Sequence, residues 1–288
     1  MIKKLSIISV CLLLTTSMIF SQAAQFLRIV PAAKPASMGE AYVGAAEDIY
    51  GVYYNPASVG KITDKQAVAS YLALYEGMGY MYAAYGQALQ SGGAIGAQIG
   101  YMNYGSIDKY VGGQKQGSVS PTSMFVSASY GMEMKTNPGL FVGGSVKLIQ
   151  ETLESSANAF ALDAGVLYTL QGQPVVIGAS ISNLGSGIKF KNEESKLPMI
   201  IRAGVGYKYS EQINIAADIS SSEGTTGVHL GVEYLMQQFA VRAGYSTLSG
   251  ISAGAGINLG EKYVLDLAYV QGPTSLGSVF KVSLWLRL

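Results

Sequence analysis

The sequence is poor in charged residues and has almost no cysteine, histidine or tryptophan. Charged residues make up 13% of its 288 residues, about half of the ~25% that is usual in soluble domains. The 19 basic and 18 acidic residues leave a formal net charge of +1. A disordered chain would carry more charge and fewer apolar residues. A nucleic-acid partner is not expected either, because the chain lacks a basic excess.

The N-terminus has the features of a secretory signal peptide. Lys3 and Lys4 precede a mostly apolar stretch, residues 5–20, and Ala23 ends a small-residue cleavage site. The stretch is shorter than the ~20 residues that span a bilayer. Residues 1–23 are therefore predicted to be a signal peptide rather than a membrane anchor.

No later apolar run is long enough for a transmembrane helix. An exported apolar chain without such helices can enter a membrane as a closed barrel, because lipid cannot satisfy the open edges of a sheet. The single cysteine, Cys11, lies in the predicted signal peptide. Disulfides and thiol ligands are therefore excluded from the exported chain.

From about residue 65 onward, apolar residues alternate with small or polar ones, as in a strand with two different faces. At the C-terminus, Val282, Leu284 and Leu286 share one face, and Lys281 and Arg287 share the other. Fourteen such segments begin near residues 66, 78, 94, 122, 140, 159, 175, 199, 212, 226, 239, 251, 263 and 278.

The connections alternate in length, which gives a second argument. Short turns follow the even-numbered segments, and the long connections, residues 104–119 and 184–198, follow odd-numbered ones. This asymmetry is typical of bacterial outer-membrane barrels. The prediction is an all-β, transmembrane antiparallel β-barrel of about 14 strands, with 12 as the alternative count. A soluble sandwich would alternate as well, but it would not explain the low charge.

Charged residues within the strands share the face that carries small residues. A charge facing lipid would cost ~2–4 kcal/mol at mid-depth, so this face is predicted to line the lumen. The predicted lumen charge network consists of Glu133, Lys147, Asp163, Arg202, Asp218, Glu233, Arg242 and Asp266. Its balance of acids and bases predicts ion pairs, with each other or with a plug, rather than an ion-selective ring.

Residues 24–64 lack the alternation of the barrel. They mix helix formers, glycines and prolines, and they include the turn Asn55-Pro56-Ala57. Their apolar content favours burial over a free tail. We therefore predict a short N-terminal hatch inside the lumen, residues 24–64, followed by the barrel, residues 65–288.

Several segments resemble, in order, the PorV/PorQ family of FadL-like outer-membrane β-barrel proteins. They include residues 26–29, 36–43, 54–57, 182–185, 188–190, 197–204, 231–234, 241–245, 252–254 and 276–277. The resemblance implies a 14-stranded barrel in the cell outer membrane, with Asn55, Pro56 and Ala57 as a gating turn of the hatch. It also implies transport, or an accessory role in protein export of the type IX kind, with secretion-machinery proteins or exported cargo as partners.

The alternative is a FadL-like channel for hydrophobic small molecules such as long-chain fatty acids. Met81, Met102, Phe125 and Phe141 are predicted to face the lumen, where they would contact such a molecule or pack against the hatch. The balanced charge disfavours a general diffusion pore. Outer-membrane lipid is the expected surrounding of the barrel.

The chain offers little to an enzyme or a metal site. His229 is the only histidine, which excludes a multi-histidine site. A catalytic histidine would need a serine nearby, but Gly231 occupies the next inward position on the same strand. A serine on a neighbouring strand could still lie beside His229. The prediction is a protein that is not an enzyme and has no cofactor and no metal.

Overall fold

The computed structural model describes residues 23–190, 193–272 and 277–288. The predicted signal peptide, residues 1–23, lies outside the described residues except for Ala23. Within the described ranges, no helix is long and apolar enough to cross a membrane.

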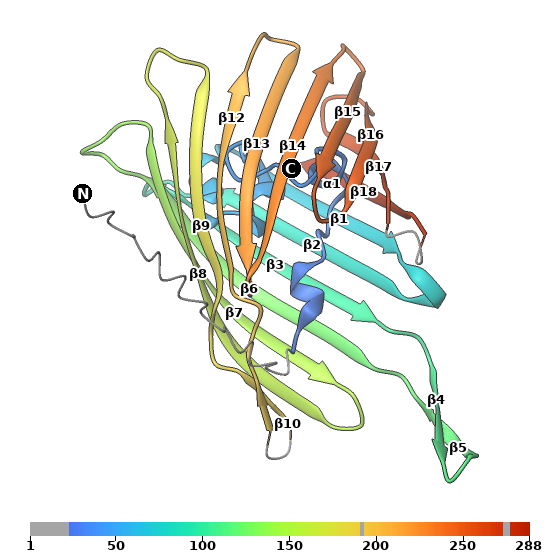
Figure 1. The fold of residues 1–288 in the computed structure, drawn as a ribbon. Helices are drawn as coiled ribbons and strands as arrows, with labels where there is room; N and C mark the ends of the chain where they lie inside the picture. Colours follow the sequence, from blue (N-terminus) through green and yellow to red (C-terminus); the bar gives the residue numbers. More distant parts are fainter. Residues whose placement is uncertain (1–22, 191–192, 273–276) are drawn as a thin grey trace, which may run out of the picture.

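Fourteen antiparallel strands form a closed barrel (Figure 1). They are β1 (Lys65–Ala73), β2 (Gly79–Ala88), β3 (Ala94–Asn103), β6 (Thr122–Glu133), β7 (Leu140–Thr152), β8 (Ser156–Thr169), β9 (Val175–Gly185), β12 (Ile200–Lys208), β13 (Ile213–Ser222), β14 (Thr225–Leu235), β15 (Phe239–Ser246), β16 (Gly250–Asn258), β17 (Tyr263–Val270) and β18 (Val279–Arg287). Each strand pairs with its neighbours in this order, and β1 closes on β18 with Tyr71 opposite Val282. The predicted 14-stranded barrel is confirmed, and every predicted strand start lies within three residues of the observed one.

Two further hairpins extend from one end of the barrel. They are formed by β4 (Ile107–Val111) with β5 (Gln114–Val119) and by β10 (Ile188–Phe190) with β11 (Glu193–Ser195). We call this end, which also carries the connections after β1, β7, β13, β15 and β17, the hairpin end, and the opposite end the turn end. The sequence predicts long connections here, residues 104–119 and 184–198, and each of them contains one of the two hairpins.

The predicted asymmetry between the two ends rests on three long connections. They are the two hairpin-bearing connections and residues 271–278, which join β17 to β18. Other connections at the hairpin end, residues 153–155 and 223–224, are shorter than the connection 134–139 at the turn end. The length difference therefore comes from three connections and is not a general property of the loops.

The outer and inner faces of the barrel wall differ in chemistry. Along β14, Val228, Leu230 and Val232 point outward and are 44%, 48% and 42% exposed, whereas His229 and Glu233 point inward and are buried. The same segregation recurs on the other strands. An outer wall of this kind is suited to contact with lipid, because charges on it would be costly.

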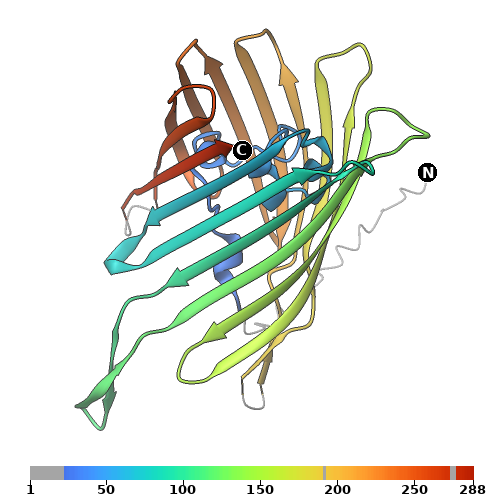
Figure 2. The same ribbon diagram turned by 180° about the vertical axis from the view of Figure 1, so that it is seen from behind.

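The N-terminal segment lies inside the barrel, where both views show it surrounded by strands (Figures 1 and 2). It forms η1 (Gln25–Arg28), α1 (Ala33–Ser37), η2 (Ile49–Tyr53) and η3 (Pro56–Lys61), and η4 (Tyr75–Gly77) follows β1. The hydrophobic core lies between this segment and the inner wall and includes residues of both. The predicted plug inside the lumen is therefore confirmed, and we call residues 24–64 the hatch.

Candidate functional site: the hatch and the lumen

The hatch lies directly against the backbone of the barrel wall. A Cβ atom built on Gly165 of β8 would overlap Asn55 Oδ1, and one built on Gly244 of β15 would overlap the backbone nitrogen of Gly39. Glycine at these positions allows two backbones, or a backbone and a side chain, to approach more closely than any other residue would. The glycines of the inner face therefore allow the hatch to pack directly against the wall.

The Asn-Pro-Ala turn is one of the points at which the hatch is fixed. Asn55 Oδ1 accepts a hydrogen bond from the backbone N–H of Ala57 at 3.0 Å and so caps η3. The amide nitrogen of Asn55 donates to the carbonyl oxygens of Val166 at 2.9 Å and Ala179 at 3.3 Å, on β8 and β9. Asn55, Pro56 and Ala57 thus join the hatch to the wall, and their gating role stays a prediction.

Substitution of Gly165 by alanine should loosen this contact. The added methyl group would displace Asn55, at a cost of about 1–3 kcal/mol for overpacking. The expected result is a lower unfolding temperature of the purified barrel in detergent, measured by heat-dependent gel mobility. Gly144→Ala is the matched control, because a Cβ there would meet its nearest neighbour, Asp163 O, at an ordinary 3.5 Å. Equal unfolding temperatures for the two variants would contradict the predicted role of Gly165.

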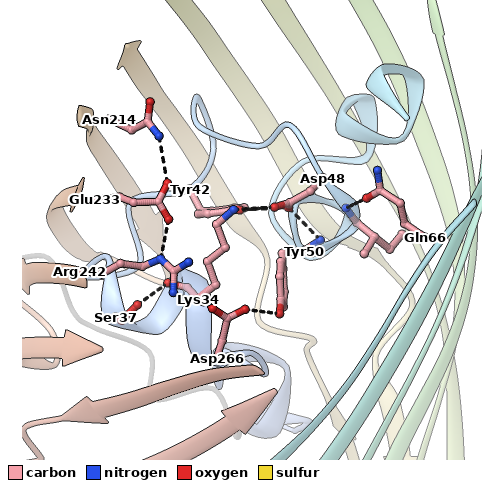
Figure 3. Close-up of polar contacts among 11 residues, drawn as sticks. Lys34, Ser37, Tyr42, Asp48, Tyr50, Gln66, Asn214, Glu233, Arg242 and Asp266 are labelled. Carbon is pink, nitrogen blue, oxygen red and sulfur yellow. Dashed lines mark hydrogen bonds and ion pairs between the residues drawn. The ribbon is translucent and has the colours of Figure 1, made fainter. Parts of the chain in front are cut away.

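An ion-pair cluster on the inner wall lies beside the hatch (Figure 3). Arg242 of β15 donates from Nε to Glu233 Oε2 at 2.6 Å and from Nη1 to Asp266 Oδ1 at 2.7 Å. Asn214 Nδ2 donates to the other oxygen of Glu233 at 2.9 Å. Three predicted members of the lumen charge network therefore meet in one buried cluster.

Polar side chains of the hatch lie next to this ion-pair cluster and bond to it or to each other. Tyr50 donates from its hydroxyl to Asp266 Oδ2 at 2.7 Å, and Lys34 Nζ donates to Asp48 Oδ2 at 2.8 Å. Tyr42 also donates to Asp48, at 2.9 Å (Figure 3). The sequence predicted none of these hatch residues. A signal was present nonetheless, since Lys34 and Asp48 are charges within a buried apolar segment and need partners there.

The hatch groups keep their protons at neutral pH. Burial raises the pKa of Tyr50 well above its usual value, and the negative charge of Asp266 raises it further. Burial works against the charge of Lys34, but Asp48 and Glu233 outweigh it, so the pKa of Lys34 is also raised. Tyr50 therefore stays a donor and Lys34 stays a cation in the closed lumen.

Three other members of the predicted network lie apart from this cluster. Asp218 Oδ2 accepts the backbone N–H groups of Tyr42 at 2.6 Å and Val43 at 2.7 Å, so it binds the hatch directly. Lys147 Nζ lies 3.1 Å from Asp163 Oδ2 on the neighbouring strand. The network is therefore divided into separate groups rather than continuous.

The last two predicted members depart from the expected pairing. Arg202 forms no hydrogen bond or ion pair among the described residues, and its guanidinium group stacks on the rings of Tyr54 and Tyr53 at 5.5 and 6.0 Å. Glu133 is exposed at the turn end, where its carboxylate accepts the N–H of Gly139 at 2.7 Å. The placement of Glu133 in the lumen network is wrong, because it is the last residue of β6 and lies beyond the hatch.

Of the four apolar residues that were predicted to face the lumen, three lie inside the barrel and one lies on its outer face. Met102 and Phe125 are buried in the core, and the ring of Phe125 lies 6.3 Å from that of Phe26 in the hatch. Phe141 is half-buried beside Leu167. Met81 is 50% exposed on the outer face, so its predicted inward orientation is wrong. The alternation of β2 turns its neighbours inward instead.

An apolar cavity opens at the hairpin end of the lumen, and we call it the vestibule. It has a volume of about 380 Å³. Its apolar lining residues are Ile29, Val30, Leu74, Met78, Met102, Leu248, Val270 and Val279. The hatch supplies its inner wall through Ile29 and Val30.

A second cavity lies at the turn end. It has a volume of about 190 Å³ and is lined by hatch residues such as Tyr42 and Asp48 and by wall residues such as Gln173 and Pro174. The hatch therefore separates two cavities that open at opposite ends of the barrel.

His229 joins the wall to the hatch. Its Nδ1 atom lies 3.1 Å from the carbonyl oxygen of Gly39, which can only accept, so Nδ1 carries the proton. Nε2 then accepts from Ser220 Oγ at 2.8 Å, on the neighbouring strand. Glu40 Oε2 lies 3.9 Å from Nδ1. The serine that the sequence left open is thus present, in a hydrogen-bonded chain that ends on the hatch backbone. Within the described part of the chain, no group of three or more acidic, histidine or cysteine side chains could hold a metal.

Comparison with known proteins finds solved structures of the same barrel fold. No protein-family model and no curated protein matches the sequence. The toluene transporter TodX of Pseudomonas putida shares the fold with a TM-score of 0.61 at 13% identity, over 88% of this chain and 96% of its own. The monoaromatic hydrocarbon channel CymD gives 0.65 at 12% identity, over 90% and 97%. A FadL homologue of Pseudomonas aeruginosa gives 0.59 at 12% identity, over 89% and 98%. At these identities the likeness establishes the fold.

Proposed function

We propose that this chain is an outer-membrane channel that takes up hydrophobic small molecules, with the vestibule as entry site and the hatch as gate. The observation that carries the proposal is the apolar vestibule, which is open at the hairpin end and closed by the hatch. Its lining resembles that of small-molecule sites, which are concave and mostly apolar. Passage to the cavity at the turn end requires the hatch to move, since the hatch lies between the two.

Structural neighbours support the same proposal. TodX is described as a toluene transporter and CymD as a monoaromatic hydrocarbon channel. An accessory role in type IX export, implied by the PorV/PorQ resemblance, has no comparable support from these neighbours. We therefore favour the channel. The proposal includes the division into a signal peptide (residues 1–23), a hatch (24–64) and an outer-membrane barrel (65–288).

Uptake across an intact bacterial outer membrane tests the proposed function. Cells that express the chain should accumulate radiolabelled naphthalene faster than cells that express a general porin at the same level. Immunoblotting of the outer-membrane fraction would establish that both barrels are present. Equal rates for the two strains would refute the proposed function.

A charge placed in the vestibule should weaken retention of a hydrophobic ligand. Met78→Asp replaces an apolar lining side chain with an ionised one, and loss of about 1.4 kcal/mol of apolar contact corresponds to about tenfold weaker binding. Binding of naphthalene by barrels in lipid nanodiscs, corrected for empty nanodiscs, would measure the change. Met236→Asp serves as the control, because Met236 is exposed in a connection at the turn end. Unchanged binding by the Met78 variant would remove the vestibule from the proposed route.

A further inference from the structure

A small polar pocket lies next to the vestibule, between the hatch and strands β12–β14. Its volume is about 40 Å³, and its lining includes Arg28, Glu40 and Tyr54 of the hatch and Arg202 and Ser222 of the wall. Arg28 and Glu40, together with Leu248, also line the vestibule. A molecule in the vestibule can therefore present one of its ends to this pocket.

Several hydrogen-bond donors around the pocket have no acceptor. The hydroxyl groups of Tyr54 and Ser222 are buried and have no hydrogen-bond partner among the described residues. The guanidinium group of Arg202 lies over the Tyr54 ring and likewise makes no hydrogen bond within the described part of the chain. A buried donor without an acceptor costs free energy. These three groups can therefore donate hydrogen bonds to an acceptor atom of a bound ligand.

The charges around the pocket do not favour an anion. Two guanidinium groups, of Arg28 and Arg202, are matched by two carboxylates, of Glu40 and Asp218, which line the same pocket. Arg28 also lies 3.9 Å from Glu223. Burial raises the pKa of Tyr54 well above its usual value, and the charge of Glu40 raises it further. The Tyr54 hydroxyl therefore remains a neutral donor, and an approaching carboxylate would meet two like charges.

We propose that this pocket binds the neutral oxygen of an otherwise apolar molecule, in the form of a hydroxyl or carbonyl group, while the hydrocarbon part lies in the vestibule. The inference rests on the proposed function and names its substrate class. It assigns a preference for oxygen-bearing hydrophobic molecules over pure hydrocarbons and over ionised carboxylates. Tyr54, Ser222 and Arg202 would donate to the ligand oxygen and so determine specificity.

Binding of three matched ligands tests the proposal. Naphthalene, 2-naphthol and 2-naphthoate share one ring system and differ in the oxygen function that they carry at neutral pH. Barrels in nanodiscs, corrected for empty nanodiscs, should bind 2-naphthol most tightly and 2-naphthoate least. Tyr54→Phe removes one hydroxyl group and should weaken binding of 2-naphthol about two- to tenfold, with binding of naphthalene unchanged.

A second tyrosine provides the matched control. Tyr80 is also fully buried with an unpartnered hydroxyl group, but its ring packs against Phe26, at 6.3 Å between centroids, and it does not line the pocket. Tyr80→Phe should therefore leave the binding of all three ligands unchanged. Ser222→Ala provides a second pocket variant and should weaken 2-naphthol binding in the same direction. Heat-dependent gel mobility would verify that each variant forms the closed barrel.

The outcomes separate this proposal from the proposed function. If the unmodified barrel binds neither naphthalene nor 2-naphthol, the proposed function fails and the pocket has no role. If it binds naphthalene but does not prefer 2-naphthol, or if folded Tyr54→Phe and Ser222→Ala barrels keep that preference, only the pocket assignment is overturned. Tighter binding of 2-naphthoate would also overturn it, because the pocket would then be an anion site.

Discussion

A disulfide between the hatch and the barrel wall is expected to abolish uptake of hydrophobic molecules, and its reduction is expected to restore uptake. Ala33→Cys with Ser283→Cys suits this purpose, because Ser283 Oγ accepts the backbone N–H of Ala33 at 2.8 Å. The only natural cysteine, Cys11, lies in the predicted signal peptide, so no other thiol should compete. Uptake of naphthalene by whole cells, measured before and after addition of a reductant, would reveal the effect.

A disulfide within the wall provides the control for this experiment. Thr152 of β7 lies directly opposite Ser156 of β8 at the hairpin end, with 2.9 Å between their side-chain oxygen atoms, so two cysteines there are close enough for a disulfide. Thr152→Cys with Ser156→Cys should therefore form a bond between two strands and leave the hatch free. Mobility on non-reducing gels would establish that both bonds have formed. If oxidation of the hatch–wall pair leaves uptake unchanged, the hatch is not the gate.

Loss of Arg242 is expected to produce the largest loss of stability among single substitutions in the lumen. Arg242→Ala would leave Glu233 and Asp266 buried without their shared cation, and removal of one partner of a buried ion pair typically costs ~3–5 kcal/mol. Asp266 also holds Tyr50 of the hatch, so the wall and the hatch should loosen together. A lower unfolding temperature and an increased leak conductance in planar bilayers are the expected results.

An exposed ion pair separates the effect of burial from the effect of charge. Lys115 Nζ lies 2.7 Å from Asp108 Oδ2 in the hairpin of β4 and β5, with both side chains largely in solvent. Pairs of this kind contribute ~0–1 kcal/mol, so Lys115→Ala should change the unfolding temperature little and the conductance not at all. Similar losses of stability in the two variants would contradict the importance of the Arg242 cluster.

The barrel could be predicted from the sequence because a strand with two unlike faces repeats every second residue. This period predicts the fourteen strands and assigns Arg242 and Asp266 to the inner face. Where both faces of a strand carry similar residues, alternation does not indicate which face lines the lumen. On β2, Tyr80 and Tyr82 face inward and Met81 faces outward, so apolar side chains occur on both sides.

The internal contacts of the hatch could not be predicted in the same way. Lys34 and Asp48 pair across irregular chain, for which no period relates position in the sequence to position in space. Arg202 was expected to pair with a carboxylate, but its guanidinium group lies over two tyrosine rings of the hatch. Such contacts depend on the conformation of the hatch inside the barrel. Alternation along the strands predicts which way wall residues point, but it does not predict the conformation of the hatch.

The seam between β1 and β18 has a consequence for the order of assembly. β1 follows the hatch directly, whereas β18 is the last strand of the barrel. The hatch forms hydrogen bonds with strands around the whole circumference. Asn55 of the hatch bonds to β8, and the backbone of the hatch bonds to Asp218 of β13 and to Ser283 of β18. Closure of the seam joins residues far apart in the sequence, which makes it a slow step. We therefore expect the wall to form around the N-terminal segment before β1 and β18 pair.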